Sequence, residues 1–223
     1  MACAAADAGV VYSQGVTTDP ALVGRGWFSH SRARPTRNYK HADDFVLEAD
    51  ATVGSVRWWG LSEGRFLDGL GNFDAFTIEF YRAVDSPGGL LPGELIASTE
   101  LSIADTAPAA TGRVNPANGA MEHEHLAVLG APVVLEAGVT YFLAVSARSV
   151  NGNRDGWMWS DADGADRYSA TYSWASGAWT GYTDTDSAFE LIATPGPGGV
   201  GVLAVGVCLA FSRRRAGPGS GRA

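Results

Sequence analysis

Three aspartates stand close together late in the chain, in the segment Asp161-Ala-Asp163-Gly-Ala-Asp166. Ca²⁺ is a hard cation that is held by several oxygen ligands, and closely spaced aspartates around a glycine bend can supply them. The segment does not follow the ligand order of an EF-hand loop, because no glutamate closes it and its flanks predict strands. The same residue types also form ordinary turns. We therefore expect either a calcium site at Asp161, Asp163 and Asp166 or an Asp/Gly turn.

Aromatic residues gather in the last third of the chain. Trp157 and Trp159 are two positions apart, so on a strand they share a face, and we expect them to point into the core. Trp174 and Trp179 flank a predicted hairpin turn at Ser176-Gly177 and are better candidates for exposure. Binding modules hold sugars by stacking them on exposed flat rings beside polar groups. Trp174 and Trp179 are therefore candidate binding residues for an extracellular polysaccharide. The alternative is that they pack in the core.

Two histidines, His123 and His125, flank Glu124. Side chains two positions apart on a strand lie on one face, so the pair could hold Zn²⁺ together. A third ligand is not evident in the sequence. The alternative is an exposed strand face without a metal, and this is the interpretation that the sequence favours.

Motifs for catalysis are not found in the sequence. We see no Gly-x-Ser-x-Gly elbow, no phosphate-binding loop and no His-Glu-x-x-His pattern. A pair of carboxylates for glycoside cleavage can occur in any acidic β protein, but nothing singles out a pair here. We therefore expect a protein without enzymatic activity, and a secreted glycan-active enzyme is the third hypothesis after a surface protein and a carbohydrate-binding module.

The segments that contain these residues are predicted to be strands. Phe76, Ile78 and Phe80 alternate with polar residues at a period of two, and no segment keeps a helical period over ten residues. Gly/Pro-rich turns separate the strands, including predicted turns at 87–89 and 92–94, and residues 105–120 are expected to be a loop. Ten or more short strands with such turns predict a single all-β sandwich, jelly-roll-like, over residues 9–193.

The charge of this body limits its partners. The chain carries a formal charge of −8, and residues 9–193 keep 12 of the 16 basic and 23 of the 24 acidic residues, so their net charge is −11. Nucleic acids are bound through cationic patches that neutralise phosphates. We therefore expect no nucleic-acid partner.

The chain ends in a three-part segment, residues 194–223. A Pro/Gly stretch is followed by an apolar run from Val200 to Phe211 and then by three arginines. The apolar run predicts a hydrophobic helix somewhat shorter than the ~20 residues that span a bilayer, and the arginines are expected to remain on the cytoplasmic side. The residues of this segment that carry the motif are Pro195, Gly196, Pro197, Gly198, Arg213, Arg214 and Arg215.

This tail resembles the C-terminal sorting signals of the PEP-CTERM type, in the Pro-x-Pro-Gly variant. Gly196 stands where the Pro-Glu-Pro form has a glutamate. The resemblance implies export, insertion of the tail in the membrane, and processing by an exosortase or a related membrane enzyme. It therefore implies a protein of the cell envelope, the cell surface or the extracellular matrix.

The body is similar to a β-sandwich module that is common in bacterial proteins with such tails and has mostly no assigned function. This resemblance covers roughly residues 40–192 and implies a jelly-roll body without known catalytic residues. It rests on these segments in this order: 42–45, 56–60, 76–81, 92–93, 135–142 and 157–159.

The first eight residues are alanine-rich and end in Ala6-Asp7-Ala8, which has the form of a signal-peptidase site. No apolar stretch precedes it, so we interpret residues 1–8 as the remnant of a signal peptide whose true start lies upstream. The alternative is a cytosolic protein with an alanine-rich leader. The two cysteines, Cys3 and Cys208, both lie outside the predicted body, so we expect no disulfide in it.

Overall fold

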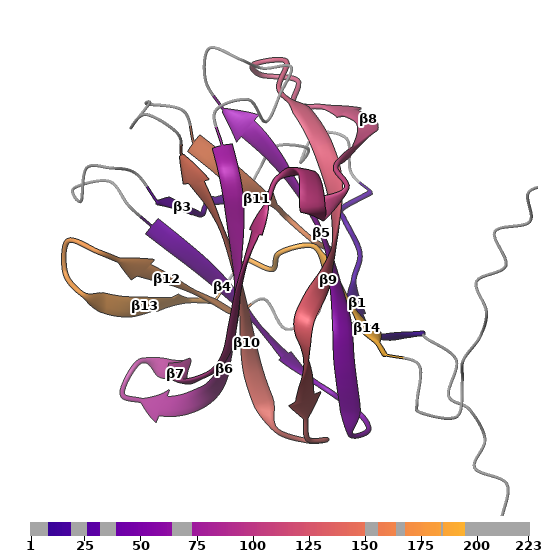
Figure 1. Ribbon diagram of the computed structural model, residues 1–223. Coiled ribbons are helices and arrows are strands. Elements are labelled where there is room, and N and C mark those ends of the chain that lie inside the picture. Colours follow the sequence, from indigo (N-terminus) through magenta and orange to yellow (C-terminus); the bar gives the residue numbers. More distant parts are fainter. Residues whose placement is uncertain are drawn as a thin grey trace, which may run out of the picture.

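The computed structural model describes residues 9–18, 26–31, 39–63, 73–149, 156–163, 168–183 and 185–194. Within these residues the secondary structure is β, apart from one 3₁₀ turn, η3 (Ala104–Thr106). The strands form two sheets whose inner faces enclose a core (Figure 1). The predicted all-β sandwich is therefore confirmed. The predicted C-terminal helix lies outside the described residues.

The first sheet is organised around its longest central strand, β5 (Ala51–Glu63). Along one side β5 pairs with β9 (Met121–Leu135), and β9 in turn pairs with β8 (Ala109–Val114). Along its other side β5 pairs with two strands, one after the other along its length. Each of these two strands pairs with one further strand. These strands are β14 (Phe189–Ala193) with β1 (Val10–Gln14), and β11 (Gly156–Ser160) with β2 (Gly26–Phe28).

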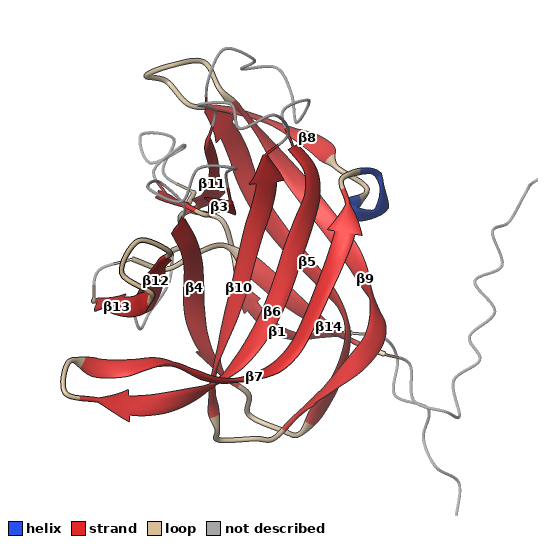
Figure 2. Cartoon of the chain, turned by 60° about the vertical axis from the view of Figure 1, so that its left-hand side comes forward, coloured by secondary structure: helices blue, strands red, loops and turns tan. Residues whose placement is uncertain are grey.

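The second sheet has β4 (Tyr39–Val46) and β10 (Thr140–Ser149) at its centre, paired antiparallel, with the short β3 (His30–Ser31) beside both. Beyond β10 lie β6 (Phe73–Ser86) and β7 (Gly89–Ser102), and beyond β4 lie β12 (Ser169–Ser173) and β13 (Ala178–Tyr182). Figure 2 shows the hairpin of β6 and β7 extending past the body of the sandwich.

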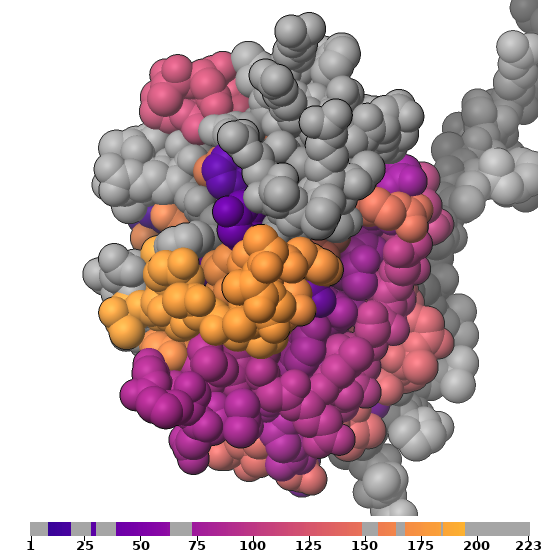
Figure 3. All heavy atoms as spheres, turned by 90° about the vertical axis from the view of Figure 1, so that its left-hand side faces the viewer, coloured from indigo at the N-terminus to yellow at the C-terminus, as the bar shows by residue number. Residues whose placement is uncertain are grey.

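The second sheet is rolled, so its two edges come together. A Cβ atom on Gly181 of β13 would lie 3.5 Å from Leu91 of β7. Figure 3 shows the segment that contains β12 and β13 lying directly against the hairpin of β6 and β7. The roll encloses a second, smaller apolar cluster on the outer face of this sheet. Its fully buried members are Ala42, Phe142, Ala144 and Ala170, with Tyr81 nearly so.

The main core lies between the two sheets and follows the period-two pattern. Phe76, Ile78 and Phe80 point inward with at most 1% of their surface exposed, while Thr77 and Glu79 point to the other face. Trp157 and Trp159 are completely buried, so the prediction that they point inward is confirmed. Removal of this much aromatic surface from water is the main contribution to the stability of the sandwich.

Two predicted features are wrong. The predicted loop at 105–120 includes the end of η3 and the edge strand β8, whose sequence Ala-Ala-Thr-Gly-Arg-Val lacks the apolar alternation of a core strand because none of its residues is buried. The predicted turn at Pro92-Gly93-Glu94 lies inside β7. Proline has no backbone N–H to donate, and an edge strand such as β7 tolerates it where the ladder is irregular, as between Tyr81 and Ala83 of the partner strand.

Candidate functional site

One group of aromatic side chains surrounds a lysine on the outer face of the second sheet. Lys40 of β4 lies opposite Tyr172 of β12, and Tyr172 lies opposite Trp179 of β13. Strand residues that face each other across a ladder point to the same side of the sheet, so the three side chains form a row. We call the following residues the aromatic face: Lys40, Tyr81, Tyr172, Trp174 and Trp179.

The rings of the aromatic face contact one another mainly edge to face. The ring centres of Tyr172 and Trp174 are 5.2 Å apart at 90°, and those of Tyr172 and Trp179 are 5.3 Å apart at 62°. Trp179 also meets Tyr81 at 5.7 Å and 76°. Such arrangements are favoured by the ring quadrupoles and hold each ring in a fixed orientation. The face is thus a preorganised aromatic surface.

Lys40 holds the centre of the aromatic face. Its Nζ donates a hydrogen bond to the Tyr81 hydroxyl at 3.0 Å and forms an ion pair with Glu79 at 2.5 Å. The same Nζ lies 5.4 Å from the ring centre of Trp174, within the range of a cation–π interaction. Burial, with the negative charge of Glu79 second, raises the pKa of Tyr81. Tyr81 therefore remains a neutral hydroxyl at physiological pH.

The two tryptophans predicted as ligand-binding residues do come together on this face, through Tyr172. Trp174 is 38% exposed, as expected of a ligand platform, whereas Trp179 is only partly exposed and packs against the smaller apolar cluster. Trp174 is thus available for stacking, and the partly buried Trp179 packs against Tyr172. The arrangement can offer the Trp174 ring to the apolar side of a sugar, whereas the Lys40 and Glu79 side chains beside it are largely buried, at 13% and 11% exposure.

The aspartates predicted as calcium ligands are arranged differently. The carboxylate of Asp163 accepts hydrogen bonds from the Thr18 backbone N–H at 2.8 Å and from the Thr18 hydroxyl at 3.2 Å. Hydrogen bonds from Thr17 and Thr18 lower the pKa of Asp163. Asp161 forms an isolated bridge with Ser187, and Asp166 lies outside the described residues. In the part of the chain that the structure describes, no three His, Cys, Asp or Glu side chains are placed to share a metal ion.

His123 and His125 do not form the exposed face that the sequence favoured. Both belong to the inner side of β9, and His125 is completely buried. Its ring stacks on Trp58 with centres 5.1 Å apart at 7°, and its Nδ1 lies 3.0 Å from the Thr106 hydroxyl. Burial lowers the pKa of His125 to about 3. The neutral ring is therefore a core residue, because aromatic stacking and one hydrogen bond suffice to hold it there.

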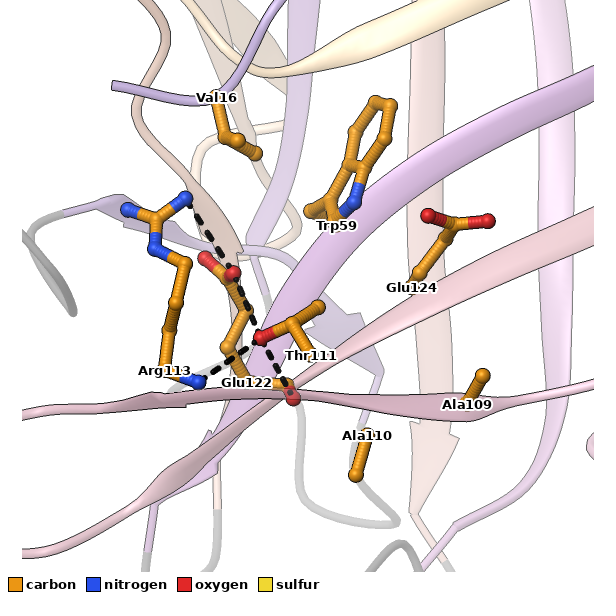
Figure 4. A pocket seen from close by; sticks show the side chains of 8 residues that line it. All are labelled: Val16, Trp59, Ala109, Ala110, Thr111, Arg113, Glu122 and Glu124. Carbon is orange, nitrogen blue, oxygen red and sulfur yellow. Dashed lines mark hydrogen bonds and ion pairs between the residues drawn. The ribbon is translucent and has the colours of Figure 1, made fainter. Parts of the chain in front are cut away.

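A cavity of about 300 Å³ lies on the outer face of the first sheet, where the edge strand β8 pairs with β9 (Figure 4). We call it the β8–β9 pocket. From the sequence, no binding role is predicted for three residues of this pocket: Glu122, Glu124 and Trp59. The pocket is lined by Val16, Trp59, Ala109, Ala110, Thr111, Arg113, Glu122 and Glu124.

Glu122 organises one wall of the β8–β9 pocket. The residue is completely buried, and its two carboxylate oxygens accept hydrogen bonds from Ser160 at 2.7 Å and from Thr111 at 3.1 Å. It also forms an ion pair with Arg113 at 3.4 Å. A buried carboxylate requires such partners because it has left water. Glu122 therefore fixes Thr111 and Arg113 of the edge strand against β9.

The aromatic face and the pocket contain residues that sequence reasoning missed. Lys40, Glu79 and Tyr81 lie far from the tryptophans in the chain, and only strand pairing brings them together. The spacing of Glu122 and Glu124 was a usable signal, because it puts two carboxylates on one face of a strand. The predicted sorting residues at 195–198 and 213–215 lie outside the described residues. Among the described residues there is no helix with the length and apolar composition of a membrane span.

Comparison with known proteins identifies no family for this chain. No family model matches it, and no curated protein matches it. Among solved structures, a CocE/NonD family hydrolase from Staphylococcus aureus aligns with 75% of the chain at 10% identity and a TM-score of 0.29. The chain corresponds to only 34% of the length of that hydrolase. The similarity is too low to support any statement about fold or activity.

Proposed function

We propose that this protein is exported and is held at the cell surface or in the extracellular matrix, where its β-sandwich acts without catalysis. The support is the three-part tail at 194–223, together with an acidic, strand-rich body. The proposal includes the hydrophobic C-terminal helix, a processing enzyme in the membrane and a jelly-roll order of the strands.

The tail is tested by a charge variant. Replacing Arg213, Arg214 and Arg215 together by serine removes the residues expected to stop translocation. We expect the triple variant to be released into the medium or left unprocessed, as seen by cell fractionation and by the mass of the mature chain. Wild-type localisation and processing of the variant would remove the main support for sorting, and a wild-type chain that stays in the cytosol would contradict export itself.

A second function, carbohydrate binding, is favoured by one specific observation. On the aromatic face, the exposed ring of Trp174 stands beside the Lys40–Glu79 ion pair. An exposed ring next to fixed polar groups is the arrangement that binding modules use for sugars. We propose that the aromatic face binds an extracellular polysaccharide. Calcium at Asp161, Asp163 and Asp166 remains a prediction that belongs to this proposal.

Binding is tested with soluble polysaccharides in affinity electrophoresis. If wild-type protein is retarded by one of them, Trp174→Ala should weaken the affinity about tenfold, since an exposed aromatic anchor typically carries more than 1 kcal/mol. Tyr39→Ala is the matched control, because Tyr39 is exposed to the same extent on β4 but is not part of the ring contacts. Retardation that persists in Trp174→Ala would exclude this face. A loss of binding in EDTA would support the calcium prediction.

A further inference from the structure

The β8–β9 pocket is separate from the aromatic face and has a composition of its own. The aromatic face belongs to the second sheet, whereas Trp59, Glu122 and Glu124 belong to β5 and β9 of the first sheet. Figure 4 shows Trp59 and Val16 on one side of Thr111, with Arg113 and Glu124 to either side. An aromatic ring, a guanidinium group and a carboxylate therefore converge on one cavity of about 300 Å³.

Polar groups of the pocket still have hydrogen-bonding positions that a ligand could use. Nη1 of Arg113 is buried and makes no hydrogen bond, because its ion pair with Glu122 at 3.4 Å does not have hydrogen-bond geometry. The Glu124 side chain is 40% exposed. A buried donor without a partner costs free energy, so a ligand that accepts its hydrogen bond would be favoured.

The charges of the pocket select the class of ligand. Each carboxylate already has a cationic partner: Glu122 pairs with Arg113, and Glu124 pairs with Arg57 at 3.3 Å. Arg57 is itself held by Glu190 at 2.5 Å. These two arginines face three carboxylates, so the group carries a net charge of −1 and repels an anionic ligand. A neutral ligand with several hydroxyls can accept from Arg113, donate to Glu124 and lay an apolar face on Trp59.

We propose that the β8–β9 pocket binds a single neutral sugar ring. Trp59 is only 9% exposed, and the part of its ring that lines the pocket provides the stacking surface. Arg113 and Glu124 exchange hydrogen bonds with the hydroxyls, and Glu122 is a positioning residue that holds Arg113. The cavity lies at the small end of the range that ligand pockets occupy. This proposal stands independently of the aromatic face, since the two sites share no residue.

The pocket can be blocked from its edge. Figure 4 shows the side chain of Ala109 on the same side of β8 as that of Thr111. Ala109 is exposed and belongs to an edge strand, so Ala109→Trp fills the pocket without entering the core. The matched control is Ala131→Trp, because Ala131 is also exposed in the first sheet but does not line the pocket.

The test observes the indole N–H signals of the full chain by NMR, with the Trp59 signal assigned from Trp59→Phe. The probes are D-glucose, D-galactose, D-mannose, D-xylose, N-acetyl-D-glucosamine and D-glucuronate. We expect at least one neutral sugar to shift the Trp59 signal saturably, and glucuronate to leave it unchanged. Ala109→Trp should weaken that binding at least tenfold, while Ala131→Trp and Trp174→Ala should retain it.

A linear tetrasaccharide of the sugar that binds distinguishes two sources of the ligand. Retained affinity means that the pocket takes the end of a chain, and lost affinity means that it takes the free sugar; both agree with the proposal. If no neutral sugar shifts the Trp59 signal, if glucuronate shifts it equally, or if Ala109→Trp binds like wild type, the proposal is wrong. None of these results depends on whether Trp174 binds a polysaccharide.

Discussion

At the scale of single residues, the buried histidines show how an ionisable group becomes part of a core. The Thr106 hydroxyl donates its hydrogen to the Ile103 carbonyl at 2.8 Å. It must therefore accept from His125, which fixes the proton of the neutral ring on Nδ1. His41 is buried against Trp159 and Thr171 in the same manner. Both rings contribute packing as long as they stay uncharged.

These histidines predict a loss of stability in acid. Burial lowers the pKa of His41 and of His125 to about 3, below the value of 6.5 for an exposed ring. Between these values the unfolded chain binds protons that the folded chain does not, so the free energy of unfolding decreases as pH falls below 6.5. Each histidine should contribute about 1.4 kcal/mol per pH unit.

The measurement is urea unfolding at a series of pH values between 7.5 and 4.5. In His125→Leu one of the two titrating rings is gone, so stability should fall less steeply with acid than in wild type. Parallel pH profiles for the two proteins would show that His125 does not titrate in this way.

The buried carboxylate of Glu122 gives a second prediction at this scale. Glu122→Leu leaves the Ser160 hydroxyl without its acceptor and Arg113 without its ion-pair partner, and should reduce the free energy of unfolding by about 1–3 kcal/mol. Glu136→Leu is the control, because Glu136 pairs with Arg82 at 3.2 Å on the surface, where an ion pair contributes little. Equal losses in the two variants, measured by urea unfolding, would contradict the role of Glu122.

At the scale of elements, the contact between β5 and β11 depends on one glycine. A Cβ atom on Gly60 would lie 2.4 Å from a ring atom of Trp157 and 2.7 Å from the Met158 carbonyl oxygen. Neither atom can move away, because Trp157 is fully buried and the carbonyl belongs to the backbone. The absence of a side chain at Gly60 therefore lets β11 approach β5 closely enough to bury its tryptophans.

This close approach predicts a much larger loss of stability for an alanine at Gly60 than at Gly130. Gly60→Ala should destabilise the protein by about 1–3 kcal/mol through overpacking. Gly130→Ala, in β9, should change the free energy of unfolding by much less, because nothing lies within 4 Å of its added Cβ atom and its backbone is not left-handed. Chemical denaturation of both variants tests the pair, and a neutral Gly60→Ala would show that β11 can shift outward without loss.

At the scale of the whole molecule, the described part of the chain closes on itself before the tail begins. The backbone N–H of Ala193 donates to Gly9 at 3.0 Å and that of Thr194 donates to Thr52 at 2.9 Å. Strand β14 supplies Phe189 and Leu191 to the main core. The N-terminal strand β1 and the last strand β14 thus lie side by side at one edge of the first sheet (Figure 1).

This closure predicts where the chain can be shortened. A chain that ends at Thr194 should unfold at the same temperature as the full chain, whereas one that ends at Ser187 should fail to fold because it lacks β14. Circular dichroism and thermal unfolding of the two truncations are the measurement. A large loss of stability on removal of residues 195–223 alone would mean that the tail contributes to the body.

The sequence by itself determined the class of fold and much of the core. Alternation at Phe76, Ile78 and Phe80, and the pair Trp157 and Trp159, identify faces, because the side-chain period of a strand is a local property of the backbone. The turn at 176–177 was also predicted from its residue types, and Gly177 adopts the left-handed conformation there. These features need no knowledge of the partner strands.

Only the tertiary structure decided which strands are neighbours, and with that the sites. Lys40 and Tyr81 join Trp174 and Trp179 because β4 and β6 lie in the same rolled sheet, across separations that no local pattern reports. The edge strand β8 was missed because its pattern is weak and its place is set by β9. His125 was placed on the wrong face because both faces of β9 carry polar residues at 122–125, and only the packing of Trp58 and Phe76 against the His125 ring shows which face is the inner one.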